Sequence, residues 1–161
     1  MIIKAISLWQ IWALAMEREL KRNETRSWST DYRGWLAIHA AKKPFYARDY
    51  SVEFVTRVRR DGLLDAPLTY GAVLCVVRLV DVLRVEQVRN RLSETERVYG
   101  NYDDGRYAWV TKDRVAIPEP IPLTGHQGLF DWDVPSWLAV KLGATSKEVQ
   151  RSQRSLFGQV D

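Results

Sequence analysis

The sequence of 161 residues has few of the side chains that build disulfides and metal sites, with one cysteine and two histidines. A single cysteine cannot form an internal disulfide, and Cys75 lies within the apolar run "AVLCVVRLV", where a thiol packs as a small hydrophobic group. A structural thiol of this kind favours a reducing, cytoplasmic compartment. His39 and His126 lie far apart and outside any His/Cys cluster, so neither a metal site nor a cofactor is expected.

Long apolar runs and familiar phosphate-binding motifs are missing as well. No stretch approaches the ~20 apolar residues of a membrane helix, and "MIIKAISLWQIWALAM" is interrupted by Lys4, Ser7 and Gln10 without a small-residue cleavage site. We therefore expect a soluble, unprocessed protein that does not enter a membrane. The sequence also has no glycine-rich phosphate loop and no serine nucleophile elbow.

What is present is an ordinary globular composition, with 46% hydrophobic and 27% charged residues. The length fits one domain with a sizeable core. Positive charge is unevenly placed, because residues 1–62 hold 12 Lys/Arg against 7 Asp/Glu and residues 63–161 hold 12 against 13. Such asymmetry indicates a polyanionic partner, although it also occurs on surfaces that bind nothing.

Hydrophobic periodicity and turn residues predict several strands with a few interspersed helices. Strands are expected over 2–8, 34–41, 71–85 and, as one bent strand or a pair, 105–121, with a short extended piece over 23–28. Helices are expected over 9–21 after an N-cap at Ser7, over 44–62, and over 93–100 with a capping box of Ser93 and Glu96. The pattern lacks regular βα alternation and predicts an α+β domain on a small mixed sheet or barrel.

Six blocks of the sequence resemble, in order, the ASCH domains of the PUA-like superfamily. The resemblance spans roughly residues 3–130 and implies a small PUA-like β-barrel flanked by helices, so we take residues 1–135 as this domain. Residues 136–161 are polar with sparse apolar side chains, which predicts a C-terminal extension that forms a weak helix or tail. It also implies binding of RNA or another nucleic acid, a place in transcription coactivator complexes, or, as in a few members, hydrolysis of acylated nucleosides or RNA. The blocks are "ISLWQIWALA", "KRNETRSW", "YRGWLAIHAAK", "GAVLCVVRLVDV", "YAWV" and "IPLTGHQGLF".

The family motif after the first helix is a lysine, a threonine, any residue, a glutamate, a threonine and an arginine, which here reads "KRNETR" from Lys21 to Arg26. The resemblance implies that Lys21, Glu24 and Arg26 line a ligand cleft. Hydrolases of this kind carry a threonine nucleophile at the place of Glu24, and a carboxylate cannot take that role. An enzyme would therefore use Lys21 and Glu24 as an acid/base pair that activates water. The alternative is a surface salt bridge, which contributes only about 0–1 kcal/mol.

The segment "IHAAKKP" offers a second set of candidates. Strand alternation places His39 on the face opposite Ile38, where small alanines leave room for a ligand. The alternative is a histidine satisfied by a backbone carbonyl. Alternation favours Lys43 for the cleft, whereas the family places its lysine directly after the alanines, at Lys42. We take Lys42 as the prediction.

Seven tryptophans are a high number for this length. Trp9, Trp12 and Trp35 are expected to pack in the core, whereas Trp109 and the loop that contains Gln127 are better placed to contact an unstacked base. The predicted function is a module that binds RNA, single-stranded nucleic acid or a nucleotide-like small molecule; a small hydrolase (ribonuclease or nucleoside amidohydrolase) and a protein-interaction domain remain alternatives. The predicted binding residues are Lys21, Glu24, Arg26, His39, Lys42, Trp109 and Gln127.

Overall fold

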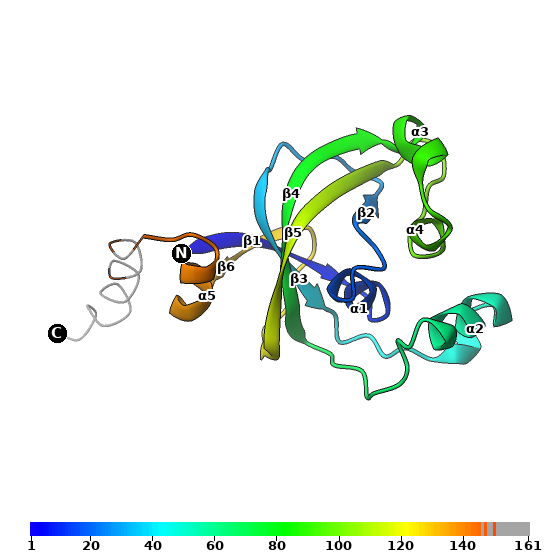
Figure 1. Ribbon diagram of the computed structural model, residues 1–161, viewed down its shortest axis with the longest axis horizontal. Helices are drawn as coiled ribbons and strands as arrows, with labels where there is room; N and C mark the ends of the chain where they lie inside the picture. Colours follow the sequence, from blue (N-terminus) through cyan, green and yellow to red (C-terminus); the bar gives the residue numbers. More distant parts are fainter. Residues whose placement is uncertain (146, 148–149, 151–161) are drawn as a thin grey trace.

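A six-stranded mixed sheet forms the centre of the protein (Figure 1). The computed structural model describes residues 1–145, 147 and 150. The strand order is β2-β5-β4-β3-β1-β6; β1 and β3 are parallel, and the other neighbours are antiparallel. The predicted α+β class is confirmed. The strands are β1 (Ile2–Leu8), β2 (Asn23–Arg26), β3 (Gly34–Ala40), β4 (Ala72–Arg84), β5 (Tyr107–Pro122) and β6 (Leu129–Asp133).

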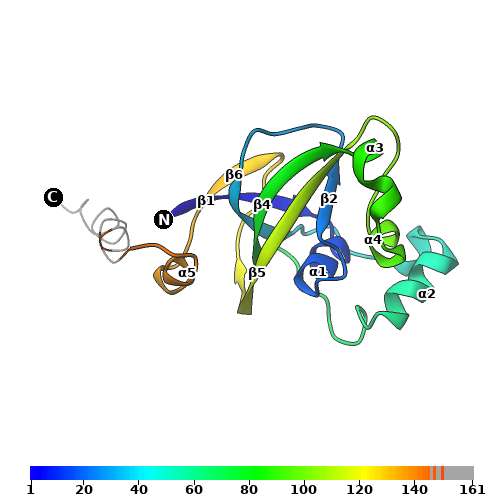
Figure 2. The ribbon, with the colours of Figure 1, turned by 45° about the horizontal axis from the view of Figure 1, so that its top comes forward.

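The long strands β4 and β5 bend, and α1 and β2 lie within the bend (Figures 1 and 2). Their pairing shifts register at three places, and such irregularities increase local twist and curvature. The edges of the sheet are β2 and β6, and within the described residues no pairing joins them. Closure into a barrel therefore stays a prediction.

Short helices surround the sheet. Figure 1 shows α2, α3 and α4 at one end of the molecule and α5 at the other, near the N-terminus. Among the described residues no helix is long and apolar enough to cross a membrane. The helices are α1 (Trp12–Glu17), α2 (Val52–Arg60), α3 (Val85–Val88), α4 (Glu94–Val98) and α5 (Ser136–Lys141), with 3-10 turns at Ala47–Asp49 and Arg89–Arg91.

The core lies on both faces of the sheet, because side chains alternate along each strand. Ile38 packs on the α1 side with Met16, whereas its neighbour Ala37 packs on the α5 side with Leu138. Cys75 is buried on the α1 side, and burial raises the pKa of its thiol to about 12. The predicted structural thiol is confirmed.

The structure corrects the predicted bounds of two helices. The first helix is shorter than expected, because Ser7 remains in β1 and the residue before α1 is Ile11, with a φ of 78°. The second does not run from residue 44: Tyr50 is extended, and α2 begins where the Ser51 hydroxyl accepts the backbone N–H of Phe54 at 3.2 Å. The predicted C-terminal extension, 136–161, contains α5, but residues 146, 148–149 and 151–161 lie outside the described residues. The predicted boundary at residue 135 stays a prediction.

Candidate functional site

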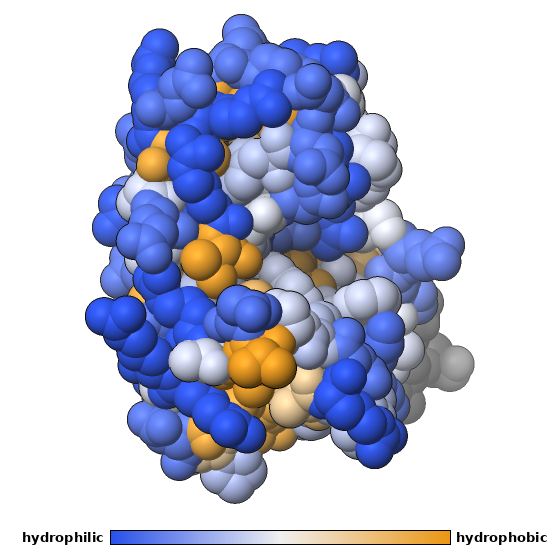
Figure 3. Space-filling model, turned by 90° about the vertical axis from the view of Figure 1, so that its right-hand side faces the viewer, coloured by the Kyte–Doolittle hydropathy of each residue, from blue (hydrophilic) through white to orange (hydrophobic). Residues whose placement is uncertain are grey.

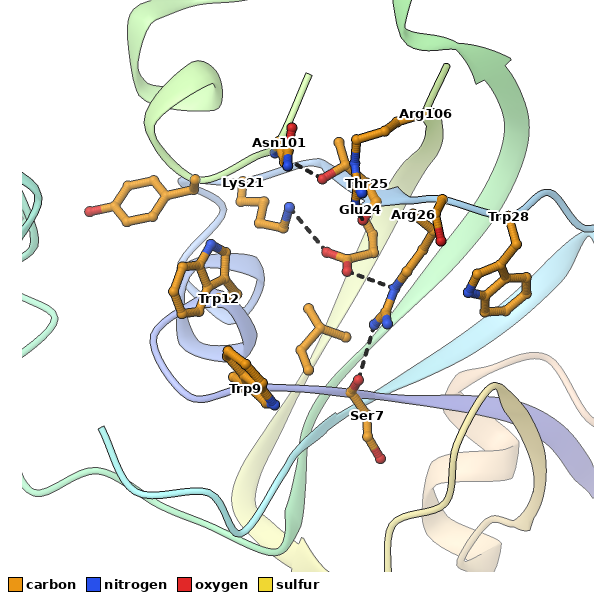
Figure 4. Close-up of a pocket in the computed structure, with 13 residues that line it drawn as sticks. Ser7, Trp9, Trp12, Lys21, Glu24, Thr25, Arg26, Trp28, Asn101 and Arg106 are labelled. Carbon is orange, nitrogen blue, oxygen red and sulfur yellow. Dashed lines mark hydrogen bonds and ion pairs between the residues drawn. The ribbon is translucent and has the colours of Figure 1, made fainter. Parts of the chain in front are cut away.

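A cavity of about 450 Å³ opens between the end of β1, α1, β2 and the segment after α4 (Figure 4). The space-filling view of the end that carries α2, α3 and α4 shows a hollowed surface bordered by hydrophilic and by hydrophobic side chains (Figure 3). The cavity collects residues that lie far apart in the sequence. Its lining consists of Ser7, Leu8, Trp9, Trp12, Lys21, Glu24, Thr25, Arg26, Ser27, Trp28, Tyr99, Asn101 and Arg106.

Three charged side chains lie in a row across this cavity (Figure 4). Lys21 Nζ is 3.0 Å from Glu24 Oε2, and Arg26 Nε is 2.9 Å from Glu24 Oε1. Lys21 also donates to the carbonyl of Asn23 at 2.7 Å, and Arg26 Nη2 donates to the carbonyl of Ser7 at 3.0 Å. The structure thus brings together the three residues that the sequence motif singled out.

The row is buried although it is charged, since Lys21 is 2% and Glu24 7% exposed. Removing two ions from water costs several kcal/mol per ion, and their attraction commonly returns little more than this. The arrangement is therefore a poor way to gain stability. A surface salt bridge, the alternative kept open for these residues, does not describe what is observed.

The pairing of β2 with β5 sets the directions in which the side chains of β2 point. Glu24 is opposite Trp109 and Thr25 opposite Ala108 in the antiparallel register. The Thr25 hydroxyl accepts the backbone N–H of Asn101 at 2.9 Å, and Arg106 Nη2 donates to the Thr25 carbonyl at 3.2 Å. The segment after α4 is thereby held against the cavity.

Trp9 and Trp109 take places that the sequence did not predict, whereas Trp12 and Trp35 pack against the core as expected. Trp9 is 52% exposed, and Trp9 and Trp12 line one side of the cavity while Trp28 lines the other (Figure 4). Trp109 is fully buried, lies edge-on to Trp28 and donates to the Trp28 carbonyl at 3.3 Å. The predicted position of Trp109, where it could contact an unstacked base, is therefore wrong. Its place on β5 directs the ring into the core beneath Trp28.

His39 does not line the cavity. Its Nε2 donates to the carbonyl of Leu123 at 2.8 Å, which fixes the tautomer and leaves Nδ1 to accept from the Ser7 hydroxyl at 2.9 Å. Burial lowers the pKa of His39, against the opposing effect of the hydrogen bond to Leu123. The structure thus shows a histidine satisfied by a backbone carbonyl, the alternative kept open for His39, and the ligand role of His39 stays a prediction.

Lys42 and Gln127 also lie outside the cavity lining. β3 ends at Ala40, so strand alternation no longer sets the directions of the two lysines. The stem of Lys42 packs over Gly71, whereas Lys43 Nζ lies 3.4 Å from the centre of the Trp9 ring. Gln127 is exposed and does not line the cavity. The lysine beside the cavity rim is therefore Lys43 and not Lys42.

Several cavity residues escaped the sequence analysis, namely Asn101, Arg106 and the three tryptophans Trp9, Trp12 and Trp28. The one signal available for Trp9 was its place directly after β1 and before α1, where a turn exposes side chains. Asn101 and Arg106 gave no signal, because they follow a short helix whose position only the tertiary structure defines.

No family model matches the chain. Among curated proteins, Activating signal cointegrator 1 is 28% identical in Homo sapiens and 27% in Mus musculus, each over 131 residues that make up 80% of this chain. The chain spans 22% of the length of these relatives.

Solved structures share the fold over most of the chain. The crystal structure titled ASCH from Zymomonas mobilis superposes with a TM-score of 0.51 and 18% identity, covering 93% of this chain and 92% of that one. A serine-to-alanine variant of that protein superposes with a TM-score of 0.50 and 19% sequence identity, and the match covers 95% of this chain and 94% of that one. The chain has the ASCH fold. The resemblance to ASCH domains is confirmed, and in this ASCH fold the "KRNETR" motif supplies one wall of the cavity.

Proposed function

We propose that this ASCH-type domain binds RNA, or a nucleotide or modified nucleoside, by taking one unstacked base into the cavity. The observation that carries the proposal is the row of buried Lys21, buried Glu24 and partly exposed Arg26 between tryptophans. Charged groups that are shielded from solvent form strong, directional hydrogen bonds with a polar ligand. Aromatic walls offer stacking to any base, about 1–3 kcal/mol for each. A nucleobase needs both kinds of contact.

The charges at the rim support a ligand that carries phosphate. Lys43 lies over the exposed Trp9 ring, and Arg106 lines the cavity on the side of Asn101. A base stacked near Trp9 would bring its backbone phosphate within reach of the Lys43 ammonium. Contacts of this kind release counterions from the nucleic acid, so we expect affinity to fall steeply as salt rises.

The hydrolase alternative has less support from the geometry. Four hydroxyl-bearing residues line the cavity, Ser7, Thr25, Ser27 and Tyr99, and in the described part of the chain none of their hydroxyls is hydrogen-bonded to Lys21 or Glu24. The Ser7 hydroxyl is bonded to His39, and that of Thr25 to the backbone of Asn101. An activated nucleophile normally lies within hydrogen-bond reach of its base. Water activation by Glu24 remains the form that an enzyme would take.

The test is a titration of the protein with a short single-stranded RNA of mixed sequence. Binding is monitored by tryptophan fluorescence, at low and at physiological salt concentration. Lys21→Met keeps the apolar stem and removes the ammonium, so we expect at least about a tenfold loss of affinity, the value of a charged hydrogen bond. Lys4→Met is the matched control, because Lys4 is also ion-paired, to Asp131 at 2.7 Å, but lies outside the cavity.

The control is expected to stay within about twofold of the unmodified protein, since charges remote from the contact surface contribute mainly through screened fields. Equal losses in both variants, or no binding of RNA and of nucleotides, would overturn the proposal. Chromatography of the RNA after incubation is the parallel measurement for the alternative. Product that forms with the unmodified protein and not with Glu24→Gln would favour the hydrolase.

A further inference from the structure

We propose that the cavity selects a uracil-type base, one that presents an imide edge; this inference rests on the proposed function. The wall of the cavity carries an ammonium at Lys21, a carboxylate at Glu24 and a guanidinium at Arg26, in that spatial order. As hydrogen-bonding groups these are a donor, an acceptor and a donor. The order is fixed, because the carboxylate contacts one cation through each oxygen.

Each of the three groups keeps capacity for a ligand. A lysine ammonium has three protons, and the described contacts of Lys21 use Glu24 and the carbonyl of Asn23. Each oxygen of Glu24 contacts one cation and has a second lone pair. Arg26 Nε lies 2.9 Å from Glu24 Oε1 as an ion pair but makes no hydrogen bond, Nη2 donates to the carbonyl of Ser7, and among the described residues no contact uses Nη1.

The Watson–Crick edges of the four bases differ in how well they complement this order. Uracil presents O4, N3–H and O2, which are an acceptor, a donor and an acceptor, so all three positions match. Cytosine presents a donor and two acceptors and matches at most two positions in any register. Guanine can place O6 toward a cation and N1–H toward Glu24, but its amino group then meets the second cation. Adenine offers an amino donor and N1, and leaves one cation without a partner.

The surroundings of the row are suited to a flat ring that enters edge first. Trp9 and Trp12 lie on one side of the row and Trp28 on the other (Figure 4). A cavity of about 450 Å³ is within the usual range for small-molecule sites, so a pyrimidine nucleotide has room. Burial of Lys21 and Glu24 makes a mismatch costly, because an unpaired polar group left in a dry site loses its hydration without return.

The experiment is an NMR titration of the labelled protein with UMP, CMP, GMP and AMP, which detects millimolar as well as tighter binding. We expect UMP to bind at least about tenfold more tightly than each of the others, as one unmatched charged hydrogen bond implies. N3-methyl-UMP is the matched ligand control, because it keeps both carbonyls and the ring but replaces the N3–H that faces Glu24. It is expected to lose at least about tenfold.

Further ligands in the same titration show whether RNA, DNA or both can supply the imide edge. Thymine carries the same edge, so dTMP and a dT octamer compared with a U octamer show whether the site takes DNA as well as RNA; either preference is compatible with the inference. Equal affinity for all four nucleotides, or undiminished binding of N3-methyl-UMP, overturns the uracil selection and leaves the proposed function standing. Failure of every nucleotide and octamer to bind overturns both.

Glu24→Gln gives an independent test within the protein. The amide keeps the volume of the carboxylate and replaces one acceptor oxygen by a donor. The preference for UMP over CMP should therefore fall by about tenfold, even if both affinities change. A preference that stays unchanged in the folded variant contradicts the assignment of Glu24 to N3–H. Should the variant not fold, the comparison of UMP with N3-methyl-UMP decides the inference on the unmodified protein.

Discussion

The carboxylate of Glu96 accepts a hydrogen bond from the backbone N–H of Arg22. The Arg22 nitrogen lies 2.9 Å from Glu96 Oε2 and 3.1 Å from Oε1. It also accepts the N–H of Asn23 at 2.8 Å and the hydroxyl of Tyr102 at 3.2 Å. The start of β2, which carries the cavity row, is thereby attached to α4. Glu96 positions the site without lining it.

Glu96→Ala is expected to lower the free energy of unfolding by about 2–4 kcal/mol, because several donors lose a charged acceptor in a buried place. Urea unfolding followed by circular dichroism measures this. Glu94→Ala on the same helix is the control: its side chain is 87% exposed and pairs with Arg57, so a change within about 0.5 kcal/mol is expected. Similar effects of the two substitutions would contradict the role given to Glu96.

Trp9→Ala is expected to weaken binding of the U octamer by about 5- to 150-fold, the range that corresponds to loss of one base stack. Its melting temperature should change little, because the ring is half exposed. Trp137→Ala is the matched control, since Trp137 is 44% exposed and also has a lysine, Lys141, over its ring, but lies outside the cavity. Fluorescence anisotropy of labelled RNA is the measurement. If Trp137→Ala weakens binding as much, stacking at Trp9 is not the cause.

Gly125→Ala is expected to destabilise the fold by about 1–3 kcal/mol through overpacking. A Cβ at this position would lie 2.5 Å from His39 Cε1 and 2.7 Å from Ser7 Oγ. The φ of Gly125 is outside the left-handed region, so the cost is steric and does not come from the backbone. Thermal unfolding checks it, with the double variant Gly125→Ala/His39→Ala as control. The double variant should be more stable than the sum of the single effects predicts; additive losses would refute the clash.

His39 predicts a pH dependence of stability. Burial lowers the pKa of His39, and the nearby His126 and Lys42 lower it further, whereas the hydrogen bond to Leu123 raises it. Below the unfolded pKa of about 6.5, the unfolded chain therefore takes up a proton that the folded state binds less readily. The free energy of unfolding should fall as pH falls from about 7 toward 5. Urea titrations at several pH values test this: His39→Gln should flatten the slope, and His126→Gln should reduce it only in part, because burial is the largest cause of the lowered pKa of His39.

The pair of Lys21 and Glu24 should show strong coupling in stability. Lys21→Met alone leaves a buried carboxylate with one cation, and Glu24→Gln alone leaves a buried ammonium without its anion. The double variant is expected to recover about 1–3 kcal/mol relative to the sum of the two single losses. A double-mutant cycle by urea unfolding gives this value directly. A coupling near zero would mean that the two charges are effectively solvated.

Local sequence signals predicted those features that depend on neighbours along the chain. The apolar stretches over 34–41 and 71–85 became β3 and β4, because β-branched and apolar side chains buried on both faces favour strands. Ser93 accepts the N–H of Glu96 at 3.1 Å, as a helix N-cap does. The other half of the predicted capping box did not form, because the Glu96 side chain is used by Arg22 and Asn23.

By itself the sequence determined the α+β class, the structural role of Cys75 and the grouping of Lys21, Glu24 and Arg26, since three charges spaced three and two residues apart at a helix-to-strand junction must lie near one another. Only the tertiary structure decided that Trp9, Trp12 and Trp28 face the cavity while Trp109 lies in the core, and that His39 serves the Leu123 carbonyl. Those outcomes depend on which distant segment covers a given side chain. In this protein β5, the segment after α4 and the loop over residues 123–125 set the burial and the hydrogen-bond partners of these residues. Local periodicity carries no information about these segments.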